Sequence, residues 1–168
     1  MTTDEIAVLI TGPSNGGLGA ETAVSLARGT PSMIILAGRS EAKIEAVRQQ
    51  INIISPTTRT VFIELDLSSQ ASVRKAAKDI SIQVDHLDAM INNAGIMACP
   101  YSTTEDGIER QFGTNHIGHF LLTNLLMGKF RRGSRIVTVT SWAHNMCEVR
   151  FDDINFQVRC VFTPKGSF

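Results

Sequence analysis

The sequence lacks both an excess of charge and a long hydrophobic run. Its 16 lysine and arginine residues balance 16 aspartate and glutamate residues, and no block of one sign occurs. Without a basic patch, we expect no nucleic-acid partner. No apolar stretch approaches the roughly 20 residues of a membrane helix, and the acidic residues 1–5 do not begin a secretory signal. We therefore expect no membrane association.

Cysteine is also scarce, and its pattern excludes a disulfide framework. The three cysteines are odd in number and irregularly spaced: Cys99, Cys147 and Cys160. We interpret them as reduced thiols of a cytoplasmic protein. His116 and His119, three residues apart, have no evident third ligand for a zinc site, and neither has His144 with Cys147. The sequence predicts no metal.

What is present is an alternation of short apolar runs and helical repeats, in a chain of 168 residues that suits one domain. Five strands are predicted at 6–11, 33–37, 60–65, 87–91 and 135–140, and helices at 20–27, 40–51, 69–80 and about 105–130. Ser40 and Ser69 are expected to cap the second and third helices. The alternation predicts an α/β fold, a Rossmann-type doubly wound parallel sheet of about five strands. Its fifth strand would be an unpaired edge.

The first predicted strand leads into a glycine-rich loop, residues 11–19 (TGPSNGGLG), and then directly into a helix. Backbone N–H groups and the positive helix end meet there, which favours a phosphate, although a tight turn with glycines for geometry alone is the alternative. Gly12 and Gly17 match the start of a P-loop. However, Leu18 and Gly19 stand where that motif needs lysine and serine or threonine. The loop therefore favours a dinucleotide.

The end of the second strand indicates which dinucleotide. Sites for NAD place an aspartate or glutamate about 20 residues beyond the glycines, to accept hydrogen bonds from the ribose. Here the strand ends in Ala37, Gly38, Arg39 and Ser40, with no carboxylate. A guanidinium offers several donors to a 2′-phosphate. The sequence thus predicts NADP, with a solvated surface arginine as the alternative reading of Arg39.

Five short motifs, in this order, resemble the short-chain dehydrogenase/reductase superfamily, particularly its retinol-dehydrogenase-like and fungal members. They are Thr11-Gly12 with Gly17-Leu18-Gly19, Asp66-Leu67, Asn92-Asn93-Ala94-Gly95, Asn115 within FGTNHIGHF, and Ser141 at the end of RIVTVTS; residues 151–155 (FDDIN) add to them. The resemblance implies an NADP-dependent oxidoreductase that interconverts an alcohol and a carbonyl on a small organic substrate, with secondary metabolism as one setting. A homo-oligomer is a further expectation.

The resemblance also implies a role for each matching residue. The pyrophosphate would be faced by the glycine loop, that is by Thr11, Gly12, Ser14, Gly17, Leu18 and Gly19. Arg39, beside Ser40, would bind the 2′-phosphate, and Asp66 and Leu67 would flank the adenine. The exit of the fourth strand would be supported by Asn93, Ala94 and Gly95. Asn115 would organise a proton relay through water, and Ser141 would bind the substrate oxygen. The loop has one residue more than the usual spacing between Gly12 and Gly17-Leu18-Gly19, which Pro13 and Asn15 are expected to absorb.

One expected motif does not occur. The family's general acid/base is a tyrosine in a Tyr-x-x-x-Lys motif after the serine, where the lysine lowers the tyrosine pKa from about 10. The only tyrosine here is Tyr101, with no lysine placed to assist it, and Lys165 has Val161 four residues before it and Pro164 beside it. We expect an incomplete NADP-binding domain at 1–157, lacking the C-terminal part of the usual fold, and an atypical tail at 158–168. Two functions stay open, an oxidoreductase and a catalytically inactive NADP-binding fragment or pseudoenzyme.

Overall fold

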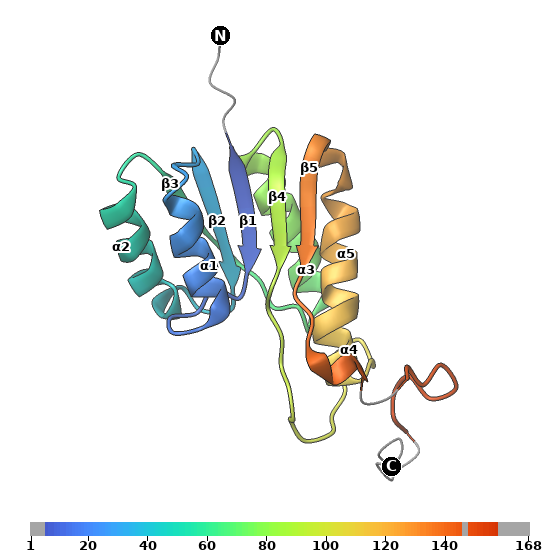
Figure 1. Ribbon diagram of the computed structural model, residues 1–168. Helices are drawn as coiled ribbons and strands as arrows, with labels where there is room; N and C mark the ends of the chain where they lie inside the picture. Colours follow the sequence, from blue (N-terminus) through green and yellow to red (C-terminus); the bar gives the residue numbers. More distant parts are fainter. Residues whose placement is uncertain (1–5, 146–147, 158–168) are drawn as a thin grey trace.

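A computed structural model describes residues 6–145 and 148–157 of the chain (Figure 1). It contains five strands, β1 (Ala7–Thr11), β2 (Met33–Gly38), β3 (Arg59–Glu64), β4 (Leu87–Asn92) and β5 (Phe130–Thr138). All neighbouring strands are parallel, in the order β3-β2-β1-β4-β5. The chain runs outward from β1 to β3 and then returns to β1's other side, which is the doubly wound topology. The predicted fold class is confirmed.

The helices lie on both faces of this sheet (Figure 1). They are α1 (Leu18–Ala27), α2 (Glu45–Ile54), α3 (Gln70–Gln83), α4 (Arg110–Phe112) and α5 (Gly118–Leu125), with a π-helical segment η2 (Gly113–Ile117) and the 3-10 turns η1 (Glu41–Lys43), η3 (Met127–Lys129) and η4 (Trp142–Asn145). α1 and α2 cover one face and α3 and α5 the other, and each pair closes its own apolar cluster. All five residues of β1 are buried because both of its faces are covered.

Several predictions fall on residues outside the described part of the chain. These are the tail at 158–168, with Cys160, Val161, Pro164 and Lys165, the start at 1–5, and Cys147. Within the described ranges, none of the helices combines the length and apolar character needed to cross a membrane. The division into a domain at 1–157 and a tail stays a prediction.

The predicted cap at Ser69 is present, but the one at Ser40 is not. The Ser69 hydroxyl accepts a hydrogen bond from the Ser72 N–H at 3.2 Å, at the start of α3. Ser40 makes no such bond, because the turn η1 intervenes before α2 begins. The Lys43 carbonyl in that turn accepts from the Asn15 N–H at 3.2 Å. This bond ties the exit of β2 to the glycine loop.

A long helix is predicted at about 105–130, and the predicted start of this helix is wrong. Residues 103–109 form a turn closed by a bridge between Thr103 and Glu109, and the helix begins at Arg110. The Glu109 carboxylate accepts from the Gln111 and Phe112 N–H groups at 2.9 and 2.7 Å. An anionic cap at this point fixes the first turn of the helix and excludes the residues before it.

The last strand begins earlier than predicted, at Phe130 and not at Arg135. Phe130 pairs with Leu87, and the register then shifts between Leu87 and Ala89, with Gly133 at a φ of +96°. The residues between Phe130 and Arg135 are held by long-range hydrogen bonds. The Ser134 hydroxyl donates to the Leu87 carbonyl at 2.6 Å, and the Arg131 guanidinium donates to the Asp88 carboxylate at 2.7 Å. A glycine is needed at 133 because side chains rarely adopt this conformation.

Strand β5 is an edge of the described sheet, paired to β4 alone, and it carries exposed apolar side chains. Val137 pairs with Ile91, whose side chain belongs to the cluster under α1 and α2. None of the described helices covers Val137, which is 48% exposed. Ile136 and Val139 are 43% and 45% exposed. Open edges with apolar residues are templates for pairing with another chain.

We expect the purified chain to associate with itself as its concentration rises, because β5 offers both unpaired backbone groups and apolar surface. Val137→Lys should weaken this association, since a charge on an edge strand opposes pairing. Thr60→Lys, on the opposite edge strand β3, is the matched control and should leave it unchanged. Sedimentation velocity over a concentration series measures the effect. A monodisperse monomer with a cooperative, reversible melt would contradict this expectation.

Candidate functional site

A cavity of about 720 Å³ lies at the carboxyl edge of the sheet. The arrows of β1, β2, β4 and β5 point the same way in Figure 1, and β3 is parallel to β2. The segments leaving β1, β2, β3 and β4 therefore meet at this edge. The cavity is bounded by the glycine loop after β1, the end of β2 with η1, residues 65–68 after β3 and residues 93–96 after β4. In open α/β sheets, ligands bind at this edge, where the strand order reverses.

Most of the residues predicted for cofactor binding line this one cavity. They are Gly12, Ser14, Gly17, Leu18, Gly19, Arg39, Ser40, Asp66, Leu67, Asn93, Ala94 and Gly95. Thr11 is fully buried at the end of β1, next to the loop. The two predicted catalytic residues, Asn115 and Ser141, do not line it. The structure thus brings the predicted binding residues together, while their individual roles stay predictions.

The glycine loop is shaped by positions that tolerate no side chain. Gly12 has a φ of +66°, and a Cβ on it would lie 2.8 Å from the Cβ of Ala94. A Cβ on Gly19 would collide with the Asn93 amide and lie 2.9 Å from the Gly12 carbonyl oxygen. The loop therefore packs closely against the exit of β4. The first N–H groups of α1, which have no acceptor within the helix, face this edge and suit an anion.

The additional loop residue is absorbed in a turn that spans Ser14 to Gly17. The Gly17 N–H donates to the Ser14 carbonyl at 3.0 Å, and Gly16 inside the turn has a φ of +78°. Asn15 is held by its backbone bond to Lys43, while Pro13 is buried. The expectation that Pro13 and Asn15 accommodate the insertion thus omitted Gly16, whose left-handed conformation makes the turn possible.

Hydrogen bonds from Thr11 and Asn93 hold the segment after β4 against the end of β1. The Thr11 hydroxyl oxygen accepts from the Asn93 and Ala94 N–H groups, each at 3.0 Å. The Asn93 side-chain amide donates to the carbonyl oxygens of Thr11 and Gly12 at 2.9 and 3.3 Å. These bonds fix the wall of the cavity that faces the glycine loop.

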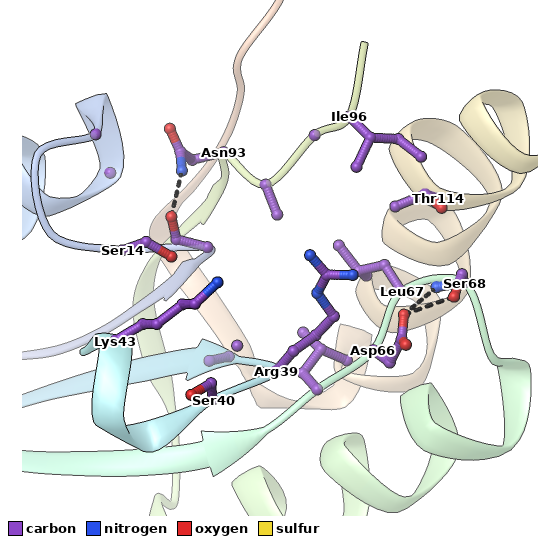
Figure 2. Close-up of a pocket in the computed structure, with 18 of the residues that line it drawn as sticks. Ser14, Arg39, Ser40, Lys43, Asp66, Leu67, Ser68, Asn93, Ile96 and Thr114 are labelled. Carbon is purple, nitrogen blue, oxygen red and sulfur yellow. Dashed lines mark hydrogen bonds between the residues drawn. The ribbon is translucent and has the colours of Figure 1, made fainter. Parts of the chain in front are cut away.

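Two cations enter the cavity from the end of β2. Figure 2 shows the side chains of Arg39 and Lys43 extending into it, between Ser14 and Asn93 on one side and Ile96 and Thr114 on the other. Neither cation has a carboxylate partner among the described residues. Arg110 adds a third cation to the lining. Sequence reasoning missed Lys43 and Arg110; the position of Lys43, four residues after Arg39, was the available signal.

On the opposite wall, Asp66 is turned toward its own loop. Its carboxylate accepts from the N–H and hydroxyl of Ser68, at 2.9 and 2.7 Å, and these bonds are drawn in Figure 2. The Asp66 N–H donates to the Ser72 hydroxyl. Thr114 also lines the cavity, and its buried hydroxyl has no hydrogen-bond partner among residues 6–145 and 148–157. An orphaned buried hydroxyl is a group that a bound ligand could satisfy.

Asn115 lies behind the exit of β4, where its side chain makes two bonds to one residue. Its Oδ1 accepts from the Ile96 N–H and its Nδ2 donates to the Ile96 carbonyl, both at 2.8 Å. A Cβ on Gly95 would lie 3.5 Å from the same oxygen. The side chain therefore positions the backbone, and the predicted water relay through Asn115 stays a prediction.

Ser141 and Tyr101 lie apart from the large cavity. Ser141, after β5, is exposed; its hydroxyl oxygen accepts from the Ala143 N–H at 3.2 Å, and its carbonyl contacts the His144 ring at 2.6 Å. Tyr101 is 59% exposed and lines a second cavity of about 460 Å³ together with Asn115 and His116. No lysine of the described part of the chain lines that cavity.

The histidines of the helix after the loop occupy two different environments. His116 is exposed and stacks between Phe112 and Phe120, with ring centroids 5.3 and 6.4 Å away. His119 is buried and contacts Thr11 and the Asn115 carbonyl. In the part of the chain that the structure describes, no three metal-ligating side chains gather.

The residues that surround the large cavity fit a dinucleotide, whose phosphate groups need donors and positive charge. A glycine loop whose space a Cβ would fill and the start of a helix open onto it. So do two cations and a hydroxyl that have no partner within the described ranges. Residues 6–151 match the short chain dehydrogenase family, and the chain belongs to this family.

Its relatives include human retinol dehydrogenase 13, which is 46% identical over 154 residues, covering 90% of this chain and 46% of that protein. Human retinol dehydrogenase 11 is 43% identical over 149 residues, covering 88% and 46%. The chain thus spans about half the length of these relatives. Among solved structures, an uncharacterized protein from Mycobacterium paratuberculosis is 43% identical with a TM-score of 0.79, over 93% of this chain and 53% of that one. Levodione reductase is 27% identical with a TM-score of 0.64, over 79% and 52%.

Proposed function

We propose that the large cavity binds NADP(H). We also propose that the chain is part of an oxidoreductase that interconverts an alcohol and a carbonyl on a small organic substrate. The observation that supports NADP is the pair of cations that line the cavity, Arg39 just after β2 and Lys43 in η1, with no carboxylate at residues 37–40. The relatives named retinol dehydrogenase and levodione reductase support an alcohol or carbonyl substrate. The cytoplasmic location expected from the cysteines belongs to this proposal.

Each wall of the cavity has a part in holding the cofactor. The glycine loop and the start of α1 would bind the pyrophosphate, and Arg39 with Lys43 the 2′-phosphate, since cations near a phosphate form charge-assisted hydrogen bonds. Residues 65–68 would border the adenine, and the Thr114 hydroxyl would gain a partner. When bound, the nicotinamide supplies hydride transfer to or from the substrate carbon. Ser141, whose proton has no acceptor among the described residues, would donate to the substrate oxygen.

A second candidate is an NADP-binding chain without catalysis. One observation favours it: these 168 residues contain a single tyrosine, Tyr101, and none of the lysines that the structure describes lines its cavity. In general acid–base catalysis by tyrosine, a nearby cation is what makes proton exchange near neutral pH effective. Both candidates share the same cofactor site. Binding therefore tests the shared part, and turnover separates them.

We expect the chain to bind NADPH at least about tenfold more tightly than NADH, because hydrogen bonds to a charged group contribute roughly 1.5–3 kcal/mol. Arg39→Asp should remove this preference, since a carboxylate repels the 2′-phosphate. Arg74→Asp, an exposed charge reversal on α3 away from the cavity, is the matched control. Fluorescence titration with both cofactors measures the affinities. Equal affinities in the unmodified chain would refute the choice of NADP.

A further inference from the structure

A buried histidine links the start of the glycine loop to the helix that carries Asn115. The His119 ring lies 2.9 Å through Nε2 from the Thr11 hydroxyl and 2.9 Å through Nδ1 from the Asn115 carbonyl. Its side chain is only 4% exposed and Thr11 is fully buried, so water does not compete for these bonds. None of the predicted roles uses His119.

The direction of these hydrogen bonds follows from the donors around Thr11. Its hydroxyl oxygen already accepts from two N–H groups, those of Asn93 and Ala94. Its single proton is left to donate, and the His119 Nε2 at 2.9 Å is closer than the Ile91 carbonyl at 3.5 Å. Nε2 is therefore the acceptor, and Nδ1 carries the proton that is donated to the Asn115 carbonyl. The chain of bonds requires one neutral tautomer.

The surroundings keep this ring neutral. Burial lowers the pKa of His119 below its ordinary value of 6.5, the Asn115 carbonyl raises it, and the neighbouring His116 lowers it further. The packed helix α3 bears Arg74, Lys75, Lys78 and Asp79, and the segment after β3 bears Asp66; the ends of β1 and β4 beside the ring bear no titratable group. Desolvation is the largest cause, as expected for a buried imidazole.

We propose that His119 is a positioning residue for the cofactor cavity. The cavity wall at residues 93–96 is held at one end by Thr11 and at the other by the Asn115 side chain. His119 bonds to both of these residues, so it fixes the two anchors of that wall relative to each other. The proposal adds a residue to the proposed NADP(H) site and rests on it for its binding consequence.

Protonation would break this arrangement. A charged ring donates from both nitrogens, so the Thr11 oxygen would receive three donors and would have to release a bond to the cavity wall. Because the pKa of His119 in the fold lies below 6.5, the unfolded chain takes up the proton first as the pH falls. The stability due to neutral His119 is thus complete above about pH 6.5 and is lost toward the lowered pKa. NADPH affinity should fall at lower pH, around the lowered pKa itself, because the ring in the folded chain takes up its proton only there.

The test uses the 168-residue chain with three variants. ¹⁵N NMR of the His119 ring should show a proton on Nδ1 at pH 7.5. His119→Leu should weaken NADPH binding about tenfold and speed amide exchange at Ala94 and Ile96, because it leaves the Thr11 hydroxyl unpaired. His119→Gln, whose amide oxygen can accept from Thr11, should restore most of the affinity and flatten its decline below pH 6.5. His116→Gln, an exposed neighbour, is the control and should retain that decline, moved toward higher pH because His116 helps to lower the pKa of His119.

A proton on Nε2, or unchanged exchange at Ala94 and Ile96 in His119→Leu, would overturn the positioning role. Equal loss of affinity in the Gln and Leu variants would also overturn it, because packing alone would then explain the effect. If the unmodified chain binds neither NADPH nor NADH, the proposed function fails, while the tautomer and the exchange rates still decide the role of His119.

Discussion

No measurable alcohol oxidation or carbonyl reduction is expected from these 168 residues, even with NADPH or NADP⁺ in excess. Ser141 and Asn115 can orient groups, but neither exchanges protons at a useful rate near neutral pH. General acid–base help is typically worth 10²–10⁴-fold, and the sequence contains no tyrosine beyond Tyr101 to provide it. Absorbance assays of NADPH consumption over a panel of ketones and aldehydes measure the rate.

A fusion protein that restores the missing motif tests the same prediction from the other side, because it should gain activity. Replacing the stretch after Phe156 by the corresponding C-terminal part of a relative that bears a Tyr-x-x-x-Lys motif should raise the rate by at least about 100-fold. In that fusion, Ser141→Ala should lower the rate again. Robust turnover by the unmodified chain that is lost in Tyr101→Phe would contradict the prediction and identify Tyr101 as the acid.

Gly118→Ala is expected to lower the free energy of unfolding by about 3 kcal/mol, the upper range for an added buried methyl group. Gly118 begins α5, where a Cβ would collide with the Leu67 carbonyl oxygen and lie 2.9 Å from the Leu67 Cβ. Because the obstacle is backbone, the helix or the segment after β3 must shift. Leu67 lines the cofactor cavity, so NADPH affinity should fall as well.

Urea unfolding of the two proteins measures the difference in stability. Gly128→Ala is the matched control, because nothing lies within 4 Å of its added Cβ, and it should change stability by less than about 0.5 kcal/mol. An unchanged unfolding midpoint for Gly118→Ala would show that α5 moves away from Leu67 at little cost.

The strands could be predicted from the sequence because each has a local apolar signal. β1 is apolar in four of its five positions and buried on both faces, so its pattern needs no knowledge of distant residues. The start of α4 depends instead on Glu109, whose N–H donates to Asn155, 46 residues further along the chain. The start of β5 depends on Asp88 and the Leu87 carbonyl, 43 and 47 residues away from their partners. Local patterns do not contain such contacts.

The candidate site divides in the same way. Glycines and the residues after strands lie at fixed offsets from an apolar run, which is why the sequence predicted Gly12, Arg39 and Asn93 for the cavity. Lys43 reaches it only because the turn η1 folds back onto the glycine loop. The binding of Asn115 to Ile96 and the burial of His119 depend on how a helix packs across the sheet, and no motif spacing expresses that.

The position of β1 in the centre of the sheet has a consequence for synthesis of the chain. Its contact with β4 joins residues 81 apart, from the Ala7 N–H to the Asp88 carboxylate. At roughly 5–20 residues per second, a ribosome makes β4 about 4–16 s after β1. During that interval β1 can pair with β2 on one side, while its other edge keeps unpaired backbone N–H and C=O groups beside side chains that are apolar in four of five positions. The nascent chain therefore passes through a stage in which its future core is a binding site for chaperones, and any pause before residue 87 would prolong it.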